Sequence, residues 1–511
     1  MMNLAVLHYH LNRGGVTRVI ENHLAALDAV LDPAEPWNVA VIYGGRCEAW
    51  NHDVADRLKA IRLTLVEAPL LDYDDVQPSG KQLSAADLLM ELYMALGRVE
   101  FDPQQTVLHI HNHSLGKNRQ LPEVVPILAQ DGYGVLLHPH DFAEDFRPGN
   151  YRHLGNTSEL YPQAPAIHYA TLNGRDHRIL QTVGVAPERL HMLPNPVPAM
   201  DNAAPRAGAR KKLRAKFDVA EDDCYVLYPI RCIRRKNIGE ALLLSVLAPQ
   251  GTIVGLTLAP INPEELPGYT KWKDFAAEFR LPCRFGVGEP GGLGFFENLA
   301  ASDLILTTSL AEGFGMVFLE SWLAGRPLIG RDLPEVTHDF ARAGVRFDWL
   351  SPQLLVPVDW VGADRFRDAV AAAYRKTLDA YNRPEPPDMA EGIDAKIQGG
   401  LVDFGDLDES MQRTVIEAVC RDAENRQQVL DANPQLSEAF AVRPDTASDV
   451  IRHNAEAIRQ HFSLEPSGQR LLNIYTQVAA SDRDETPQPL PGTDKVLDQF
   501  LRLDRFRLIR T

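Results

Sequence analysis

The segment SLAEGFGMVFLE, residues Ser309 to Glu320, follows the apolar run DLILTTS and leads into a second apolar stretch that ends at Gly325. This order predicts a buried strand, a glycine-containing loop and then a helix. The free N–H groups at the start of a helix, together with the positive end of its dipole, form a site for an anion. Gly313 and Gly315 would let such a ligand approach the backbone. The segment therefore predicts an anion site in an α/β domain.

Two glutamates, Glu312 and Glu320, flank this predicted anion site. Glu320 lies on a helix that is apolar nearly all round, which predicts a buried carboxylate in need of a hydrogen-bond donor. Ribose hydroxyls are one such donor, and Glu312 is placed to accept hydrogen bonds from the hydroxyls of a sugar. The pattern equally fits a structural role, in which the helix dipole stabilises Glu312 and Glu320 is paired within the core.

Short apolar runs alternate with helical patterns in both halves of the chain. LAVLHYH, NVAVIY, TVLHIH, GVLLHPH and AIHYATL precede residue 200, and YVLYPI, GTIVGLTL, DLILTTS and RPLIG follow residue 205. This alternation predicts two α/β domains with parallel sheets. Gly14 and Gly15 follow the first run and predict a turn that leads into a helix. The proline-rich stretch from Pro194 to Pro205 predicts the linker between the domains.

The size and composition of the chain restrict its class. Its 511 residues exceed one ordinary core and predict two to four units. The net charge of −17 disfavours nucleic acid and anionic membrane surfaces as partners. Five cysteines without a CxxC pair predict reduced thiols and a cytoplasmic protein. Neither a signal peptide nor an apolar run of transmembrane length is expected.

Basic residues follow another predicted strand, in the segment YPIRCIRRKNIGEALLL. The strand is expected to end at Ile230, and Arg231 and Lys236 lie in the loop before the next helix. Cations at the carboxyl end of a parallel strand suit phosphate oxygens. A basic loop is more often solvated surface, so this segment alone leaves both interpretations open.

These segments together resemble the family-four retaining glycosyltransferases. EGFGMVFLE is similar to the two-glutamate signature of that family, and Arg231 and Lys236 match its basic pair in spacing. GGVTRVIENHL, PNPV, ENLAASDLILTTS and RQHFSLEPSGQRLLNIYTQV add further similarity, so the resemblance spans most of residues 3 to 479. Ile230 and Pro196 stand where the family has glycine. The resemblance implies the GT-B fold, in which two Rossmann-like domains face each other across a cleft.

The expected domain boundaries follow from this resemblance and from the linkers. Residues 1–200 are predicted to form the acceptor-side domain, and residues 205–445 the nucleotide-sugar domain. A partly helical insertion without a counterpart in the family occupies about residues 384–445 of the second domain, and its role is open. Residues 446–480 are predicted to be closing helices that cross back to the first domain, and residues 481–511 a linker and a short helix.

The resemblance implies transfer of a hexose, glucose or mannose, from a nucleotide diphosphate sugar to a carbohydrate or small-molecule acceptor, with retention of configuration. Arg231 and Lys236 would stabilise charge on the leaving diphosphate, so neither a cofactor nor a metal is predicted to be required. The predicted catalytic residues are His140, Arg231, Lys236 and Glu312. The predicted donor-binding residues are Gly15, Asn195, Arg231, Lys236, Glu312, Gly313, Phe314, Gly315, Met316 and Glu320.

Histidines form a further group, because His109 and His111 alternate on one predicted strand and His138 and His140 end the next. Alternation places each pair on one face of its strand. Zinc is one interpretation, but no cysteine or acidic residue completes a set of ligands, so the sequence predicts core or cleft histidines and no metal. By resemblance, His140 would contact a donor hydroxyl. The predicted acceptor-side residues are His111, His113 and Asp141.

Two charged segments are predicted to be ordinary surface. The acidic string from Asp72 to Asp75 is expected to be a solvated loop, and the basic run 206–217 a solvated helical face. Two other functions stay open, namely another GT-B enzyme such as a sugar-nucleotide epimerase, and a non-catalytic scaffold that binds nucleotide sugars or glycans. The sequence leaves the base, the sugar, the acceptor, the linkage and the oligomeric state undetermined.

Overall fold

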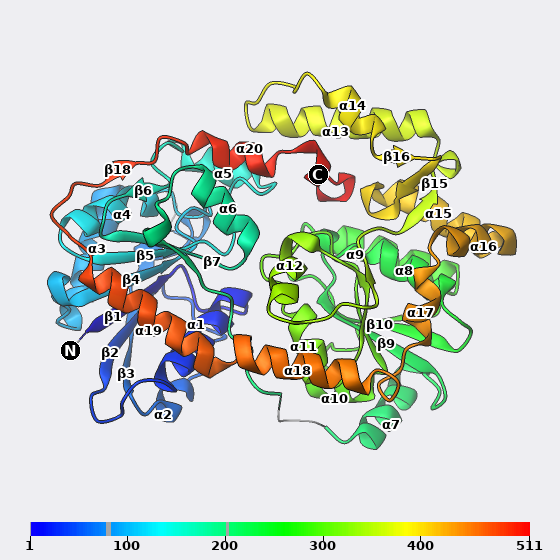
Figure 1. The fold of residues 1–511 in the computed structure, drawn as a ribbon, viewed down its shortest axis with the longest axis horizontal. Helices are drawn as coiled ribbons and strands as arrows, with labels where there is room; N and C mark the ends of the chain where they lie inside the picture. The colour runs from blue at the N-terminus through cyan, green and yellow to red at the C-terminus, as the bar shows by residue number, and fades with distance from the viewer. Residues whose placement is uncertain (1, 78–82, 201–203) are drawn as a thin grey trace. The chain divides into compact units, whose positions relative to one another are not determined.

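The computed structural model describes residues 2–77, 83–200 and 204–511 of the chain, which forms two compact units (Figure 1). Unit 1 comprises Met1–Pro198 and Gln460–Arg502, and unit 2 comprises Ala199–Arg459 and Leu503–Thr511. The chain passes from unit 1 to unit 2 within the predicted linker, of which residues 201–203 lie outside the described residues.

Unit 1 is built on a seven-stranded sheet whose strand order is β3-β2-β1-β4-β5-β7-β8. All of its strand pairs are parallel. The strands are β1 (Asn3–His8), β2 (Trp37–Tyr43), β3 (Ile61–Glu67), β4 (Thr106–His111), β5 (Gly134–His138), β7 (Ile167–Thr171) and β8 (Leu190–Met192). Strands β1, β4 and β5 are buried throughout because helices cover both faces of the sheet.

Two helices from opposite ends of the sequence pack together in unit 1. Helix α1 (Gly15–Asp28) carries a buried apolar stripe, and α19 (Leu464–Ala480) lies against it (Figure 1). Gly468 permits this approach, because a Cβ at that position would lie 1.9 Å from the carbonyl oxygen of Ala26. Any larger residue at position 468 would therefore push the two helices apart.

Unit 2 is built on a six-stranded sheet in the order β11-β10-β9-β12-β13-β14, again with parallel pairs. Its strands are β9 (Cys224–Arg231), β10 (Thr252–Leu258), β11 (Cys283–Phe285), β12 (Leu304–Thr307), β13 (Leu328–Arg331) and β14 (Leu350–Ser351). In both sheets the chain builds outward from a central strand to one side and then to the other, which is the Rossmann arrangement. Ligands bind at the carboxyl ends of the strands in such sheets.

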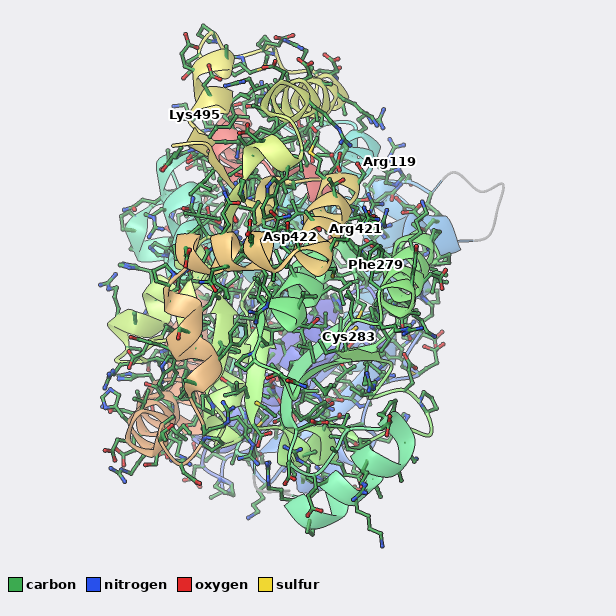
Figure 2. The ribbon with its side chains drawn as sticks, turned by 90° about the vertical axis from the view of Figure 1, so that its right-hand side faces the viewer. Arg119, Phe279, Cys283, Arg421, Asp422 and Lys495 are labelled. Atoms are coloured by element: carbon green, nitrogen blue, oxygen red, sulfur yellow. The ribbon has the colours of Figure 1, made fainter. Side chains whose placement is uncertain are left out.

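Helices and short strands after β14 complete unit 2. Strands β15 (Leu355–Pro357), β17 (Leu401–Asp403) and β16 (Ile397–Gln398) form an antiparallel sheet in that order. The helices here are α13 (Ala363–Ala380), α14 (Met389–Asp394), α15 (Glu409–Arg421), α16 (Ala423–Ala432), α17 (Gln435–Ala441) and α18 (Ser448–Phe462). Figure 2 shows Arg421 and Asp422 where α15 gives way to α16. The Arg421 guanidinium lies 6.0 Å from the ring centroid of Phe279.

A buried ion network ties the small sheet to the main sheet of unit 2. Arg331, at the end of β13, donates hydrogen bonds to Glu240 of α8 (Ile238–Leu247) and to Asp403 of β17. The Arg331 Nη2 atom lies 2.5 Å from the Glu240 carboxylate and 2.8 Å from that of Asp403. All three side chains are at most 3% exposed. Loss of one partner would leave uncompensated charge in the core.

The remaining described elements cover these sheets. The other helices are α2 (Val54–Arg57), α3 (Ala85–Arg98), α4 (Leu121–Gln130), α5 (Pro148–Leu154), α6 (Gly174–Thr182), α7 (Arg206–Phe217), α9 (Leu266–Glu278), α10 (Phe295–Ala301), α11 (Val317–Leu323), α12 (Pro334–Arg342) and α20 (Asp494–Phe500). Strands β6 (Pro162–Gln163) and β18 (Gln488–Pro489) form a small antiparallel pair. The predicted basic helix is α7, but its Arg206 and Arg210 are not simply solvated, because both bind Asp303.

The segment after α20 returns to unit 2. Arg507 binds Asp406 at 2.8 Å, and Lys396 donates to the carbonyl oxygen of Phe506 at 3.2 Å. Arg505 binds Glu335 of α12 at 2.9 Å. The last nine residues, 503–511, are therefore part of the packing of unit 2. No helix among the described residues is both long and apolar enough to cross a membrane, and all five cysteines are free.

Candidate functional site

The predicted basic and acidic residues lie in two loops at the carboxyl edge of the sheet of unit 2. Strand β9 ends at Arg231, which is half-buried, and its parallel neighbour β12 ends at Thr307. Because the two strands are parallel neighbours, the loops that follow them leave from the same edge. This edge is where ligands bind in open α/β sheets.

Hydrogen bonds fix these two loops against each other. The backbone N–H of Leu310 donates to the carbonyl oxygen of Arg235 at 2.9 Å. The carbonyl oxygen of Lys236 accepts hydrogen bonds from the Tyr228 hydroxyl at 2.8 Å and from the Thr308 hydroxyl at 2.9 Å. The backbone from which the Lys236 side chain extends is therefore held by both β9 and the loop after β12.

Glu312 lies at the centre of an ion cluster in this site. Its carboxylate accepts a hydrogen bond from the ammonium group of Lys236 and another from Nη1 of Arg235, the latter at 2.9 Å. Glu312 is 9% exposed. Burial alone would raise the pKa of Glu312. The attraction of Lys236 and Arg235 is larger and lowers that pKa to about 2. Glu312 is therefore ionised at neutral pH and orients two cations.

Arg235 is the member of this cluster that sequence reasoning missed. Its guanidinium also donates to the carbonyl oxygen of Ala311 at 2.7 Å. The motif comparison drew attention to Arg231 and Lys236 only. Arg235 is part of a 3-10 turn, Arg234–Lys236, that directs its side chain to the loop of Glu312. A basic residue directly before the matched lysine was the available signal.

The glycine-containing loop leads into a short helix. Gly315 has φ +83, and a Cβ there would lie 2.6 Å from the ring of Phe318, so only glycine fits this position. Phe314 is buried and Met316 is half-buried. Helix α11 has only seven residues, Val317–Leu323, so its dipole is short. The cations after β9 therefore add positive charge that so short a helix supplies only weakly.

The second glutamate of the motif is Glu320 in α11. It is half-buried, and among the residues that the structure describes none donates a hydrogen bond to its carboxylate. Burial raises the pKa of Glu320 to about 7. Of the two alternatives that the sequence left open for Glu320, pairing within the core is not what the structure shows. A desolvated carboxylate without a donor is suited to ligand hydroxyls.

Two of the predicted donor-binding residues lie in unit 1. Gly15 begins α1 and is exposed, with open space where a Cβ would lie. Asn195 follows β8 and is buried, and within the described residues its Oδ1 atom has no hydrogen-bond partner. Asn22 of α1 holds the same turn by donating to the carbonyl oxygen of Pro196 at 3.3 Å.

His140 and Asp141 follow β5 at the carboxyl edge of the sheet of unit 1. Both backbone N–H groups donate to Oδ1 of Asn112, at 2.6 Å and 3.0 Å. Nε2 of His140 lies 2.7 Å from Nδ1 of His111. Burial, with a smaller contribution from the nearby His23, lowers the pKa of His140 to about 3. The imidazole is therefore neutral at physiological pH. The Asp141 carboxylate binds Arg147 at 2.5 Å.

The other predicted histidines are deeply buried in unit 1. His113 lies 3.0 Å from the carbonyl oxygen of Leu160 through Nε2, and both His111 and His113 are at most 1% exposed. The predicted pairing on one strand face is confirmed, with ring centroids 4.2 Å apart for His109 and His111. His23 of α1, which the sequence did not single out, packs against this group.

The expectation of a solvated acidic loop at Asp72 is wrong for Asp72 itself. That side chain is buried and accepts two hydrogen bonds from Arg46, at 2.5 Å and 2.6 Å. The partner lies 26 residues earlier, after β2, and brings a full positive charge to the carboxylate. Asp75 is exposed, as expected, and lies near Lys117 at 3.7 Å.

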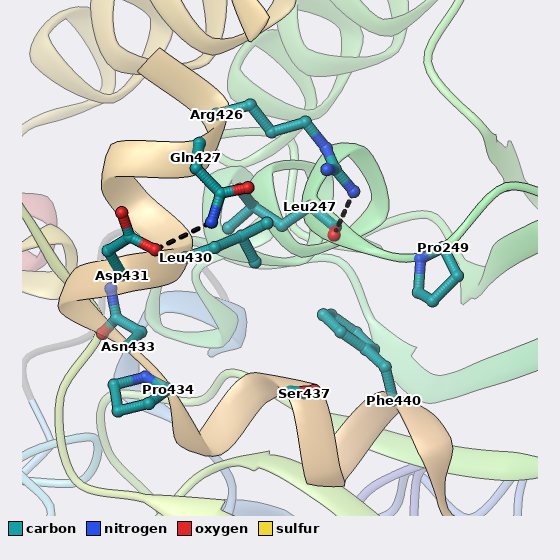
Figure 3. A pocket seen from close by; sticks show the side chains of 10 residues that line it. All are labelled: Leu247, Pro249, Arg426, Gln427, Leu430, Asp431, Asn433, Pro434, Ser437 and Phe440. Atoms are coloured by element: carbon teal, nitrogen blue, oxygen red, sulfur yellow. Dashed lines mark hydrogen bonds between the residues drawn. The ribbon is translucent and has the colours of Figure 1, made fainter. Parts of the chain in front are cut away.

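A separate cavity of about 490 Å³ opens on unit 2 (Figure 3). Its lining comes from the end of α8 and from α16 and α17, and Arg426 donates to the carbonyl oxygen of Leu247 at 2.7 Å across it. Pro249 lines it just before β10 begins, at the amino end of that strand. The described lining residues include none of the predicted donor-binding residues, so this cavity is distinct from the Glu312 cluster.

Glu144 is expected to make the stability of unit 1 depend on pH. Its carboxyl group is buried and accepts a hydrogen bond from the Tyr161 hydroxyl at 3.0 Å. Burial raises its pKa to about 7, against the lowering effect of that bond. Between about pH 4.5 and 7 the native state therefore holds a proton that the unfolded state has lost, and stability falls as pH rises.

Glu144→Gln is expected to remove this dependence. The variant should gain about 2–3 kcal/mol in free energy of unfolding over the wild type near pH 8, and little near pH 4. Urea unfolding at both pH values, followed by tyrosine fluorescence, measures the difference. Glu159→Gln, at an exposed carboxylate of the same segment, should show no such dependence. Equal gains at both pH values for Glu144→Gln would contradict the raised pKa.

The two Rossmann-like units are those of a GT-B protein, and the cluster of Glu312, Lys236 and Arg235 lies in the second unit. No family model matches the chain. Over 530 residues it is 23% identical to mannosylglucosyl-3-phosphoglycerate synthase of Petrotoga mobilis, covering 100% of this chain and 99% of that protein. HepE of Anabaena, in complex with UDP and glucose, is 14% identical with a TM-score of 0.53. Its likeness covers 93% of this chain and all of that chain.

A second solved structure has a similar fold. Sucrose-phosphate synthase of Thermosynechococcus elongatus is 15% identical, with a TM-score of 0.56 over 94% of this chain and all of that chain. These likenesses confirm the GT-B fold with two Rossmann-like sheets. They also confirm the resemblance to glycosyltransferases that EGFGMVFLE indicated, and the family-four resemblance is consistent with them.

Proposed function

We propose that the protein is a retaining glycosyltransferase that moves a hexose from a nucleoside diphosphate sugar to a carbohydrate acceptor, without a required metal. The observation that carries the proposal is the cluster of Lys236 and Arg235 on the buried Glu312, at the carboxyl edge of parallel strands. It presents fixed positive charge beside a glycine loop. The helix that follows the loop carries Glu320, whose carboxylate has no hydrogen-bond donor among the described residues. That combination suits a diphosphate flanked by a sugar and a ribose.

The proposed roles follow from charge and position. Arg231 and Lys236 bind the diphosphate oxygens and stabilise the charge that develops when the leaving group departs. Glu312 keeps Lys236 in place and accepts hydrogen bonds from sugar hydroxyls, while the backbone of Gly313 to Met316 contacts the sugar. Glu320 accepts from the ribose hydroxyls. Gly15, Asn195 and His140 contribute on the sugar side, and Asp141 on the acceptor side.

The proposed reaction passes through an oxocarbenium-like state with attack on the face that the leaving group vacates. The bond between the anomeric carbon and the diphosphate oxygen breaks, and a bond from the acceptor hydroxyl oxygen to that carbon forms. The hydroxyl proton passes to the departing phosphate oxygen. No protein carboxylate needs to form a covalent intermediate, which agrees with Glu312 being held by two cations.

The relatives suggest which substrates to test first. The Petrotoga protein is named for the product mannosylglucosyl-3-phosphoglycerate, and HepE was crystallised with UDP and glucose. We therefore propose glucose or mannose as the transferred sugar and an acceptor that carries a sugar with a phosphoglycerate group. A phosphoglycerate acceptor would add negative charge, which makes salt-dependent binding an expected property.

The test combines UDP-glucose, GDP-mannose and ADP-glucose with glucosyl-3-phosphoglycerate, 3-phosphoglycerate or no acceptor, with and without EDTA. One donor should release nucleotide in step with formation of an α-linked product, identified by its anomeric NMR coupling, and EDTA should change the initial rate less than about twofold. Isomerised sugar without transfer would indicate an epimerase. Donor binding without turnover would indicate a scaffold, and an inverted linkage would overturn retention.

Glu320→Gln is expected to weaken nucleotide binding about 10- to 100-fold at pH 8, above the Glu320 pKa of about 7, because hydrogen bonds to a charged group contribute about 1.5–3 kcal/mol. Calorimetric titration of the nucleoside diphosphate measures this, and the 2′,3′-dideoxy nucleotide should bind both proteins equally. Glu335→Gln, at a more exposed glutamate at the start of α12, is the control. Equal loss for the normal and dideoxy nucleotides would contradict the ribose role.

A further inference from the structure

Four buried histidines of unit 1 meet between α1 and the sheet. His23 comes from α1, His109 and His111 from β4, and His138 from the end of β5. One ring nitrogen from each lies within 4.8 Å of a ring nitrogen from each of the others. The sequence argument against a metal was that no cysteine or acidic residue completed the set of ligands. His23, 86 positions before His109, completes it.

Ring nitrogens of three of these histidines have no hydrogen-bond partner within the described part of the chain. They are both nitrogens of His23, Nε2 of His111 and Nε2 of His138. The three side chains are at most 5% exposed. A buried polar atom without a partner is unfavourable, so four of them in one place require an explanation. A bound ion that accepts one lone pair from each of the three rings would give a partner to three of the four atoms.

In two of the four rings, a neighbouring side chain holds the nitrogen that would face away from an ion. Nδ1 of His111 lies 2.7 Å from Nε2 of His140. Nε2 of His109 lies 3.1 Å from Nδ1 of His138, and a metal bound at Nε2 of His109 would replace that hydrogen bond. Nδ1 of His109 lies 2.8 Å from the Tyr475 hydroxyl. Histidines that bind metals are usually oriented in this way by a hydrogen bond at their other nitrogen.

A small space and the burial of the rings bear on a metal. A cavity of about 10 Å³, about the size of one water molecule, lies beside the cluster. It is lined by His23, His109, His111 and Tyr475 together with aliphatic side chains, and His138 does not line it. All four side chains are at most 5% exposed, and neutral imidazole is the form of histidine that binds metals.

We propose that His23, His109, His111 and His138 bind one divalent transition-metal ion of the kind that prefers imidazole ligands, with Zn²⁺ as the representative. Four side-chain ligands fill a tetrahedral shell, which is the arrangement of a structural rather than a catalytic zinc site. The ion would cross-link α1, β4 and β5. It would take no part in binding the diphosphate, so the inference stands apart from the proposed transfer reaction.

The test uses the full chain, with any affinity tag removed, stripped by a chelator and incubated overnight with Zn²⁺ or Co²⁺. One equivalent of metal should remain bound after gel filtration. Co²⁺ should give the intense visible absorption of a tetrahedral site, and Zn²⁺ should raise the Tm by several degrees. Binding of less than a tenth of an equivalent, or a weak octahedral Co²⁺ spectrum, would show a stack of neutral histidines without metal.

The matched variants are His23→Leu and His191→Gln. His23→Leu removes one ligand and leaves an apolar side chain among Leu4, Leu24 and Leu27, so it should fold and bind Zn²⁺ at least about tenfold more weakly. His191 pairs with His168 at 2.8 Å in the same unit, outside the cluster, and its variant should keep wild-type binding. Unchanged stoichiometry and Co²⁺ spectrum in His23→Leu would overturn the assignment.

Discussion

Replacement of Lys236 by alanine is expected to lower kcat about 100-fold or more, because removal of one preorganised contact to developing charge costs about 10²–10³ in rate. The Lys236 side chain is 15% exposed and its backbone is held by Tyr228 and Thr308, so its ammonium group is in place before substrate binds. In the variant Glu312 keeps only Arg235 as a partner. Steady-state kinetics with the preferred donor measures kcat and kcat/KM.

The matched control is Arg234→Ala. Arg234 lies on the same 3-10 turn but is exposed, and it contacts Glu265 and the backbone of Thr511 instead of Glu312. Its loss removes the same formal charge from the same loop and should change kcat less than about twofold. If Lys236→Ala retained near wild-type turnover, or if the two variants lost activity equally, the proposed role of Lys236 would be wrong.

Replacement of Arg331 by methionine is expected to lower the free energy of unfolding of unit 2 by about 3–5 kcal/mol. Arg331 is the shared cation of Glu240 and Asp403, and its removal leaves two buried carboxylates without compensation. The pKa of Asp403 is held below its usual range because Arg331 outweighs the effect of burial. Chemical denaturation followed by tryptophan fluorescence measures the loss.

Two comparisons separate this mechanism from a general effect of losing an arginine. Arg346→Met breaks an exposed pair with Asp348 and should cost less than about 1 kcal/mol. Adding Glu240→Gln and Asp403→Asn to Arg331→Met should recover part of the stability, since neutral amides need no counter-charge. If Arg331→Met lowered the free energy of unfolding no more than Arg346→Met does, the buried network would contribute little to stability.

The sheets were predictable where the strands are buried on both faces. Continuous apolar runs located β1, β4, β5, β9 and β12, because a parallel strand inside an α/β sheet contacts helices on both sides. Strand β3 at the edge was missed. Its residues, IRLTLVE, alternate between polar and apolar, and only two of its side chains are fully buried. A strand as short as β14, which has two residues, is too short to show an apolar run or an alternation in the sequence.

In the candidate site, the sequence could predict only residues that belong to a motif of fixed spacing. Motif spacing identified Glu312, Glu320 and Lys236 because each lies at a fixed offset from a strand end or from another motif residue. Partners that depend on tertiary packing were not visible. Arg46 reaches Asp72 across 26 positions, and Asp403 reaches Arg331 across 72. Such pairs are set by which strands become neighbours, which a single sequence does not display.

The crossings of the chain between its units also bear on how it can fold during synthesis. Domains generally fold as units, N-terminal first, as the ribosome produces them. Here unit 1 lacks α19 until residue 480 has been made and α20 until residue 500, and unit 2 lacks its segment 503–511 until later still. Unit 1 can therefore not complete its packing before most of unit 2 has been synthesised. Until residue 480 has been made, the face of α1 that packs against α19 stays uncovered by that helix.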